Sequence, residues 1–233
     1  IDVYTDFGIK SVKKKSSSSL QYEAGHKKAL LLNDALHPEI NAYSIFEYNE
    51  KEAQTFKKLG FGTVLTHQKD GISRGTSSLI TLTNESNQLI KNSVAAHFSF
   101  SKGSSQQQYP RSLMGMIALL RQSYYDGKWY EKNEGKVPFN LGWKAWNNQQ
   151  GLPQIFEAND KLNVLRADDI AKEFGVSYWI KGGGNEYQIV EELKKRKISL
   201  IQTVNFPQAI DVSDLYETDW VYLKDMKEWE WAP

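Results

Sequence analysis

The alternation of apolar and polar residues along the chain predicts strands and helices that follow one another in regular order. Apolar residues recur at intervals of three and four from residue 112 to about residue 130, which predicts one long helix. A shorter helix is predicted to begin after Asn49, a good N-cap residue with Glu52 at the capping-box position, and to end at Gly60. The tryptophan-rich stretch 140–149 is predicted to form a further helix.

The last hundred residues show the most regular pattern. The predicted strands are 153–157, 176–180 and 199–204, and the predicted helices between them are 162–174 and 186–197. Strands that alternate with helices at about 22 to 24 residues imply right-handed parallel crossovers. An open doubly wound sheet and a closed eight-stranded barrel both satisfy this pattern, and about six strand–helix steps can be counted, two fewer than a closed barrel needs.

The first hundred residues are less regular. A strand-like run opens the chain, residues 10–40 are interpreted as an insertion or flexible loop, and residues 61–67 are predicted to form a strand. Residues 70–76 are interpreted as a polar turn with a single arginine, and two β-rich runs predict a β excursion around 78–100. Together these elements indicate an α/β fold, with residues 1–233 interpreted as one barrel-like segment.

Composition narrows the functional classes. Lysine plus arginine (29) nearly balances aspartate plus glutamate (28), so no overall field favours nucleic acid or an anionic membrane. The basic, serine-rich stretch 10–19 is interpreted as a solvated loop, and no nucleic-acid partner is predicted. The absence of cysteine excludes disulfides and zinc–thiolate sites, and no apolar run approaches the roughly 20 residues of a membrane span. Because residue 1 is not methionine and lies inside a strand-like run, we expect a piece of a longer chain.

Candidate metal ligands lie where the predicted strands end, since the carboxyl ends of parallel strands form the functional edge of such sheets. Of the four histidines only His67 is at a predicted strand end, and Asp6 and Glu157 lie at two others. A single histidine cannot make a catalytic zinc site, which needs three or four protein ligands, although a carboxylate-rich site for magnesium or calcium is possible in principle. Hydrogen-bonded polar side chains at this edge are therefore the favoured interpretation, and no catalytic residue is assigned.

Candidate substrate-binding residues at the same edges are Arg74, Asn159 and Asn185. A salt bridge that pins the loop of Arg74 is favoured over an anion clamp. The run "KGGGNEY" at 181–187 follows a strand and opens a helix, so its backbone N–H groups could bind phosphate, but a tight turn is favoured because no dinucleotide or Walker motif is present. Clustered aromatic residues such as Trp129 could stack on sugars, although packing is the commoner role.

Longer stretches of the chain resemble a known family. In order they are "IDVYTDFG", "LGFGTVLTHQKDGISRGTSSLITL", "YPRSLMGMIALLRQSYYDGKWY", "LPQIFEANDKLNVLRADDIAKEFG", "WIKGGGNEY" and "VNFPQAIDVSD". This series is similar to the imidazolonepropionase-like branch of the amidohydrolase superfamily, and most similar to long bacterial members, common in Bacteroidetes, that carry two such regions in tandem.

The resemblance implies a distorted (β/α)8 TIM barrel, incomplete within this chain. It also implies a metal centre at the carboxyl ends of the strands, where a metal-bound hydroxide attacks a C–N or related bond. The family's ligands are a histidine pair on the first strand, a lysine, glutamate or histidine at the fourth, histidines on the fifth and sixth, and an aspartate on the eighth. The corresponding positions here are Tyr4 and Asp6, then Glu157, then Gly182 or Gly183, then Asn205, with no counterpart of the aspartate.

Tyrosine and glycine cannot replace imidazole as neutral nitrogen ligands, so the resemblance points to a degenerate metal site. Our first hypothesis is a non-catalytic barrel region, a pseudoenzyme-like scaffold without a cofactor. Its expected partner is the remainder of its own polypeptide or another copy. The second hypothesis is an active metal-dependent hydrolase of C–N bonds, with zinc or another divalent metal, completed by residues outside this segment. The third is a sugar- or peptide-binding module. A periplasmic location is implied by the resemblance only.

Overall fold

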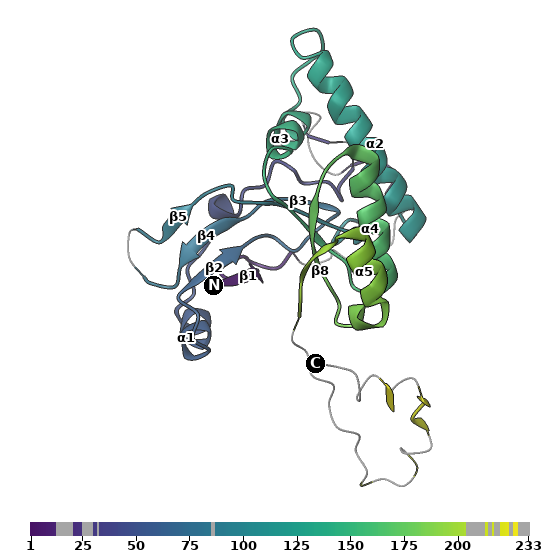
Figure 1. Cartoon of the computed structure of the whole chain (residues 1–233). Helices are drawn as coiled ribbons and strands as arrows, with labels where there is room; N and C mark the ends of the chain where they lie inside the picture. Colours follow the sequence, from purple (N-terminus) through teal and green to yellow (C-terminus); the bar gives the residue numbers. More distant parts are fainter. Residues whose placement is uncertain are drawn as a thin grey trace. The chain divides into compact units, whose positions relative to one another are not determined.

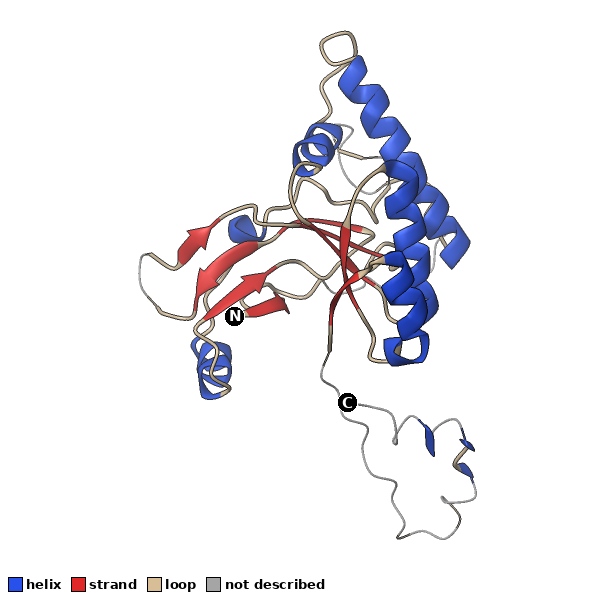
Figure 2. Ribbon diagram, in the orientation of Figure 1, coloured by secondary structure: helices blue, strands red, loops and turns tan. Residues whose placement is uncertain are grey.

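The computed structural model describes residues 1–12, 21–24, 30–31, 33–84, 87–203, 213, 216, 220–223 and 226–227. The chain divides into two compact units, Ile1–Phe156 and Glu157–Pro233. Figure 1 labels the elements of both units, and Figure 2 distinguishes helices from strands.

The first unit contains a four-stranded sheet in the order β1-β2-β4-β5. Its strands are β1 (Asp2–Thr5), β2 (Thr63–Thr66), β4 (Ser78–Thr81) and β5 (Leu89–Lys91). β1 is parallel to β2, whereas β2–β4 and β4–β5 are antiparallel, so the chain leaves the parallel pattern after β2. Figure 1 shows this sheet with α1 beside it. The predicted β excursion around 78–100 coincides with β4, β5 and the next strand, β6 (Ala96–Ser99).

Helix α1 (Glu50–Lys58) forms as its sequence predicts. The side chain of Asn49 accepts hydrogen bonds from the backbone N–H groups of Lys51 and Glu52 at the N-terminus of the helix. Glu52 does not complete a capping box. Its carboxylate instead accepts a hydrogen bond from the backbone N–H of Gly8 (3.3 Å), in the turn after β1. The helix packs on an apolar cluster of Phe7, Ala53, Val64, Ile80 and Leu82.

A second group of strands consists of β3 (Ser73–Thr76), β6 and β7 (Gln154–Glu157), in that order. β3 is antiparallel to β6, and its residues Ser73 to Gly75 are buried. The interpretation of residues 70–76 as a turn was therefore wrong for 73–76. Short polar side chains gave no apolar alternation there, and the strand depends on pairing with a distant partner. Gly75 allows close approach, since an added Cβ would lie 2.0 Å from the carbonyl oxygen of Ile40.

Helices α2 (Leu113–Lys132) and α3 (Leu141–Gln149) confirm the two helices predicted in this region. Ser112 and Asn140 cap their N-termini through side-chain oxygens. The helices meet at Trp146, which is 1% exposed and lies 5.2 Å from Tyr124, ring centroid to centroid. Trp129, in contrast, is 57% exposed. The aromatic cluster is thus divided between core and surface.

The second unit follows the predicted order of strand and helix. Its elements are α4 (Lys161–Phe174), β8 (Tyr178–Lys181), the 3-10 helix η2 (Glu186–Ile189), α5 (Val190–Arg196) and β9 (Ser199–Ile201). β8 and β9 are parallel neighbours, as right-handed crossovers require. The predicted helix 186–197 is divided because Ile189 departs from helical geometry, with φ −131° and ψ 27°.

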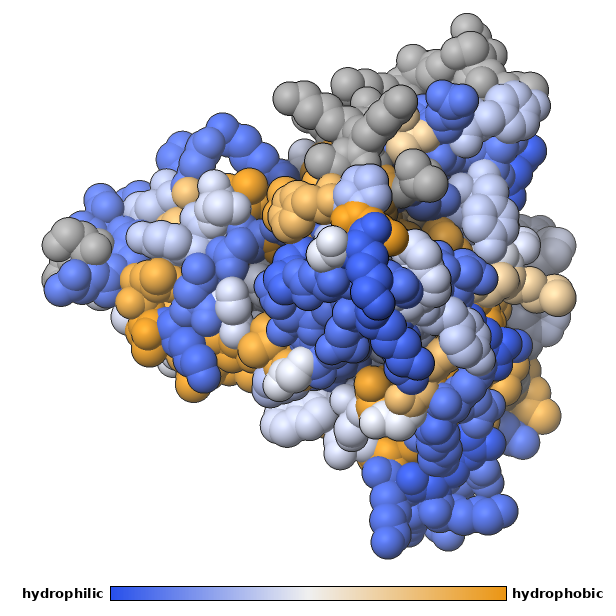
Figure 3. Space-filling model, turned by 90° about the horizontal axis from the view of Figure 1, so that it is seen from above, coloured by the Kyte–Doolittle hydropathy of each residue, from blue (hydrophilic) through white to orange (hydrophobic). Residues whose placement is uncertain are grey.

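The parallel strand pairs support a mixed α/β fold. Because the described strands form sheets that are not closed, the eight-stranded barrel stays a prediction. Much of the predicted 10–40 loop lies outside the described residues. Figure 3 shows polar side chains over most of the face that it presents, with apolar side chains between them. Within the described part of the chain, no helix combines the length and apolarity that crossing a membrane requires.

Candidate functional site

The two first-strand positions of the predicted metal site, Tyr4 and Asp6, each contact a side-chain cation. Arg74 donates a hydrogen bond from Nη1 to the Tyr4 hydroxyl (2.7 Å). Lys69 forms an ion pair with Asp6, with Nζ 3.0 Å from Oδ1, and Nζ also lies 5.4 Å from the centroid of the Tyr4 ring. Tyr4 lies in β1 and Asp6 directly after it, and residues from the loop after β2 and from β3 contact both side chains.

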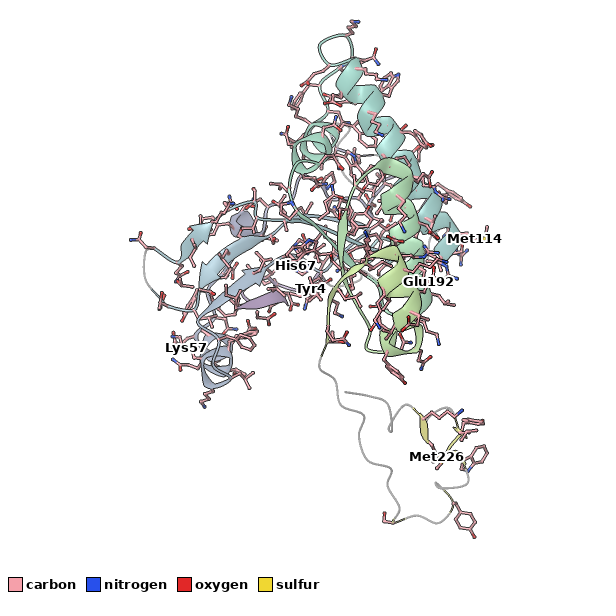
Figure 4. The ribbon with its side chains drawn as sticks, in the orientation of Figure 1. Tyr4, Lys57, His67, Met114, Glu192 and Met226 are labelled. Atoms are coloured by element: carbon pink, nitrogen blue, oxygen red, sulfur yellow. The ribbon has the colours of Figure 1, made fainter. Side chains whose placement is uncertain are left out.

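His67 lies directly after β2 and packs against Tyr4, with ring centroids 4.5 Å apart (Figure 4). Its other neighbour is His97 of β6. The two imidazole rings stack at 3.7 Å with an interplanar angle of 13°. Both histidines are buried, at 0% and 1% exposure. Sequence reasoning missed His97, although it lies in a run predicted to be β-rich, because that run was interpreted as an excursion away from the functional edge.

Burial and nearby cations keep both imidazoles neutral. Burial is the largest cause that lowers the pKa of His67 well below its ordinary value, and electrostatic interactions with His97, Arg74 and Lys69 lower it further. Burial and then Arg74 lower the pKa of His97 to about 3. A hydrogen bond with the backbone of Thr5 acts in the opposite direction on His67, and neither ring nitrogen of His97 has a hydrogen-bond partner among the described residues.

The neighbouring loop is fixed by its own hydrogen bonds. Asp70 accepts hydrogen bonds from the backbone N–H (2.6 Å) and the hydroxyl (2.7 Å) of Ser104. Arg74 also donates from Nε to the carbonyl oxygen of Gly71 (3.2 Å). Arg74 is 3% exposed, so its positive charge is held inside the first unit, close to Tyr4.

In the second unit Glu157, the remaining candidate ligand, contacts Lys181 of β8, with 3.5 Å between Oε1 and Nζ. Both side chains are about one-fifth exposed, at 18% and 20%. Asn185, a candidate substrate-binding residue, accepts the backbone N–H of Lys161 through Oδ1 (2.9 Å). Its side chain therefore holds the first turn of α4.

The glycine turn that could have bound phosphate already contains a carboxylate. Glu186, which is 2% exposed, accepts the backbone N–H groups of Gly183 (2.7 Å) and Gly184 (2.9 Å). An added Cβ on Gly182 would lie 2.5 Å from the Glu186 carboxyl carbon, and one on Gly183 would lie 2.2 Å from the carbonyl oxygen of Asn159. The glycines therefore allow close approach of other groups to the backbone.

The structure brings together only some of the predicted site residues. Tyr4, Asp6, His67 and Arg74 are neighbours in the first unit. The second unit holds Glu157, Asn159, Gly182, Gly183 and Asn185, whereas Asn205 lies outside the described residues. Among the residues that the structure describes, no group of three or more His, Asp or Glu side chains could hold a metal ion.

Comparisons with known proteins gave one informative result. No family model matches the chain, and a search of curated proteins found no match. Among solved structures, the chain is similar to an amidohydrolase from Thermotoga maritima MSB8, with a TM-score of 0.64 and 19% sequence identity. The chain has an amidohydrolase-like fold. The match covers 96% of this chain and 62% of that protein, so the chain spans less than two thirds of the length of its structural neighbour.

This likeness supports the amidohydrolase part of the predicted resemblance at the level of the fold. It does not fix an activity, because one fold hosts many functions. The metal centre that such a fold implies fits the described residues poorly. Asp6 and Glu157 each contact a lysine, and the hydroxyl of Tyr4 accepts a hydrogen bond from a guanidinium. A divalent cation at any of these positions would have to displace or repel a cation already there.

Proposed function

We propose that this chain is an amidohydrolase-like region without hydrolytic activity of its own, which serves as a scaffold for an active partner region. The observation that carries the proposal is the pair of cations at the first-strand positions: Arg74 on Tyr4 and Lys69 on Asp6. A side-chain cation near a carboxylate supplies part of the charge balance that a metal would otherwise supply.

In finer detail, we propose that the segment is part of a (β/α)8 barrel within a longer protein, as in the tandem family members that the sequence resembles. The candidate partner is the remainder of the polypeptide or another copy of the chain. The structural match covers 96% of this chain but 62% of the longer amidohydrolase, which is consistent with that arrangement.

Elemental analysis of the purified full-length protein tests the absence of a metal centre in this region. The variants are Asp6→Asn and Glu157→Gln, and the control is Glu191→Gln, whose side chain is 91% exposed. We expect the amounts of zinc, iron, manganese and nickel to be unchanged in all three variants. A loss of about one metal equivalent in Asp6→Asn or Glu157→Gln, but not in the control, would refute the scaffold proposal and favour the active metal-dependent hydrolase.

A further inference from the structure

Helix α2 presents an apolar face on the side opposite to its buried residues. Six exposed residues fall within about 100° of the helix circumference: Met114, Ala118, Arg121, Gln122, Tyr125 and Trp129. The exposed fractions of Met114, Tyr125 and Trp129 are 81%, 56% and 57%, and Figure 4 labels Met114 near the N-terminal end of the helix. The exposed side of a helix usually carries charged and polar residues, and a contiguous exposed apolar patch commonly marks an interaction site. These six residues are named the α2 face below.

The α2 face consists of two rows of side chains, each with a spacing of four residues. The first row is made of small or unbranched side chains, namely Met114, Ala118 and Gln122. The second row is made of bulky side chains, namely Arg121, Tyr125 and Trp129. Rows with this spacing form the ridges by which helices pack, and the ridge of one helix fits a groove of its neighbour. The bulky row is therefore a ridge, and the row with Ala118 at its centre is a groove.

Reversal of the helix exchanges the two rows. Positions 114 and 129, 118 and 125, and 121 and 122 are equally distant from the midpoint between Arg121 and Gln122. A twofold axis through that midpoint places two α2 helices antiparallel, with the groove of each copy opposite the ridge of the other. Met114 then faces the indole of Trp129, a favourable contact of a thioether with an aromatic ring. Ala118 leaves room for the ring of Tyr125. The α2 face is thus complementary to itself.

We propose that the α2 face joins two copies of this chain through an antiparallel, twofold-symmetric helix pair. The polar centre of the face favours a second copy over a membrane surface. Arg121 and Gln122 lie between the apolar residues and would have to follow them into the lipid, which is costly for a charged side chain. In the helix pair, Arg121 of each copy instead lies opposite Gln122 of the other. Another protein as partner would not require the symmetry of the two rows.

This inference rests on the proposed scaffold only in choosing another copy as the partner. Metal content tests the scaffold, and self-association tests the α2 face. A metal-free monomer would overturn the inference alone, whereas a metal-binding dimer would overturn the scaffold alone. One helix face is smaller than the roughly 1,200–2,000 Å² of a standard stable interface, so the dissociation constant should be about 10–100 µM.

Sedimentation equilibrium of the full-length protein, at concentrations up to about 0.2 mM, measures this self-association. The key variant is Ala118→Glu, which places a charge in the groove at an exposed position where a helix tolerates glutamate. The control variant is Leu162→Glu, at an apolar residue outside α2 that is 50% exposed. We expect the dissociation constant to rise at least tenfold in Ala118→Glu and to stay within twofold in Leu162→Glu.

Disulfide formation tests the antiparallel register. The chain contains no cysteine, so the single variants Ala118→Cys and Tyr125→Cys each add one thiol to it. Because positions 118 and 125 face each other in the proposed pair, a mixture of the two variants should form the 118–125 disulfide at least fivefold faster than Ala118→Cys forms a disulfide with itself. Faster or equal reaction of Ala118→Cys with itself would contradict the antiparallel pair.

A protein that stays monomeric over the whole concentration range, or self-association that Ala118→Glu leaves unchanged, would overturn the proposal. Two further results would overturn it by assigning the α2 face to another occupant. Lys128 and Lys132 are exposed on the same helix, so binding of the monomer to vesicles of anionic phospholipid, lost in Ala118→Glu, would assign the face to a membrane. A monomeric full-length protein that Ala118→Glu makes less stable to heat, with Leu162→Glu unchanged, would assign the face to the remainder of the polypeptide.

Discussion

Tyr4 on β1 and Asp6 directly after it are the positions that the proposed degenerate metal site assigns to absent histidines. Packing of β1 depends on its backbone pairing with β2 and on the buried Phe7 that follows, neither of which needs histidine at positions 4 and 6. Two side-chain cations contact these positions, Arg74 of β3 at Tyr4 and Lys69 of the preceding loop at Asp6. The proposed loss of metal ligands is therefore compatible with an intact strand.

The buried histidine pair predicts an acid-sensitive stability. The pKa of His97 is about 3 in the folded chain and near 6.5 when unfolded, so the unfolded chain takes up a proton first as the pH falls. Stability is then lost below pH 6.5, by about 2 kcal/mol at pH 5 for this residue. Urea unfolding at pH 7.5 and at pH 5 measures the decrease in the free energy of unfolding between the two pH values. This decrease should be smaller by about 2 kcal/mol in His97→Phe than in the original chain.

His37 provides a control of opposite sign. Burial alone would lower the pKa of His37, but Glu39, Asp70 and Asp34 outweigh burial and raise it. Its contribution is present below pH 6.5 and is lost as the pH rises through the folded pKa. His37→Gln should therefore lose more stability at pH 5 than at pH 7.5. For the buried pair, the contradicting result would be a free energy of unfolding that depends on pH in His97→Phe as it does in the original chain.

Gly8 and Gly60 allow a matched test of close packing after the first strand. Both have positive φ, +68° and +89°. An added Cβ on Gly8 would lie 2.3 Å from a Phe46 ring carbon, whereas one on Gly60 meets nothing within 4 Å. Gly60→Ala should cost about 1–2 kcal/mol from the backbone alone, and Gly8→Ala a further 1–3 kcal/mol from overpacking. Equal losses in thermal or urea unfolding would show that Phe46 moves away without cost.

Among the elements, the helices were the most predictable from sequence because their end signals are local. Ser112, Asn140 and Gly60 mark termini through contacts within a few residues. Strand β3 and the position of His97 were not predictable in the same way. β3 has polar residues at buried positions, and His97 meets His67 only because two distant segments pack together. Such long-range pairings leave little signal in one sequence.

The N-cap of α4 is a further test at its own terminus. Asp160 accepts the backbone N–H groups of Leu162 (2.8 Å) and Asn163 (3.0 Å). Asp160→Ala should lower the free energy of unfolding by about 1 kcal/mol, whereas Asp160→Asn, which keeps an oxygen acceptor, should cost only a few tenths. A similar loss in both variants would show that charge, and not the cap hydrogen bond, stabilises this end of α4.

The glycine turn before η2 predicts a larger effect. Glu186→Ala would leave the N–H groups of Gly183, an exposed residue, and Gly184, a partly buried one, without their carboxylate partner. We expect a loss of about 1.5–3 kcal/mol in urea unfolding, the usual contribution of hydrogen bonds to a charged group. Glu191→Ala, at a residue that is 91% exposed, should change stability by less than about 0.5 kcal/mol. A loss below about 1 kcal/mol for Glu186→Ala would mean that water replaces the carboxylate freely.

The whole chain combines an amidohydrolase-like fold with a first-strand site held by its own cations. The near balance of 29 basic and 28 acidic residues gives no overall field toward a polyanion. The sequence resemblance anticipated the likeness of fold to the Thermotoga maritima amidohydrolase, whereas the eight-stranded barrel stays a prediction. It did not anticipate the contacts of Lys69 and Arg74, because these depend on side-chain placement in three dimensions.

A crystal structure of the full-length protein soaked in zinc, with anomalous scattering measured at the zinc edge, tests the central claim most directly. The account predicts that Lys69 stays on Asp6 and Arg74 on Tyr4, with no anomalous peak at the roughly 2.0–2.2 Å zinc–oxygen distance from the carboxylates of Asp6 or Glu157. A zinc peak bound to either carboxylate, with its lysine displaced, would contradict the account and establish a metal centre in this region.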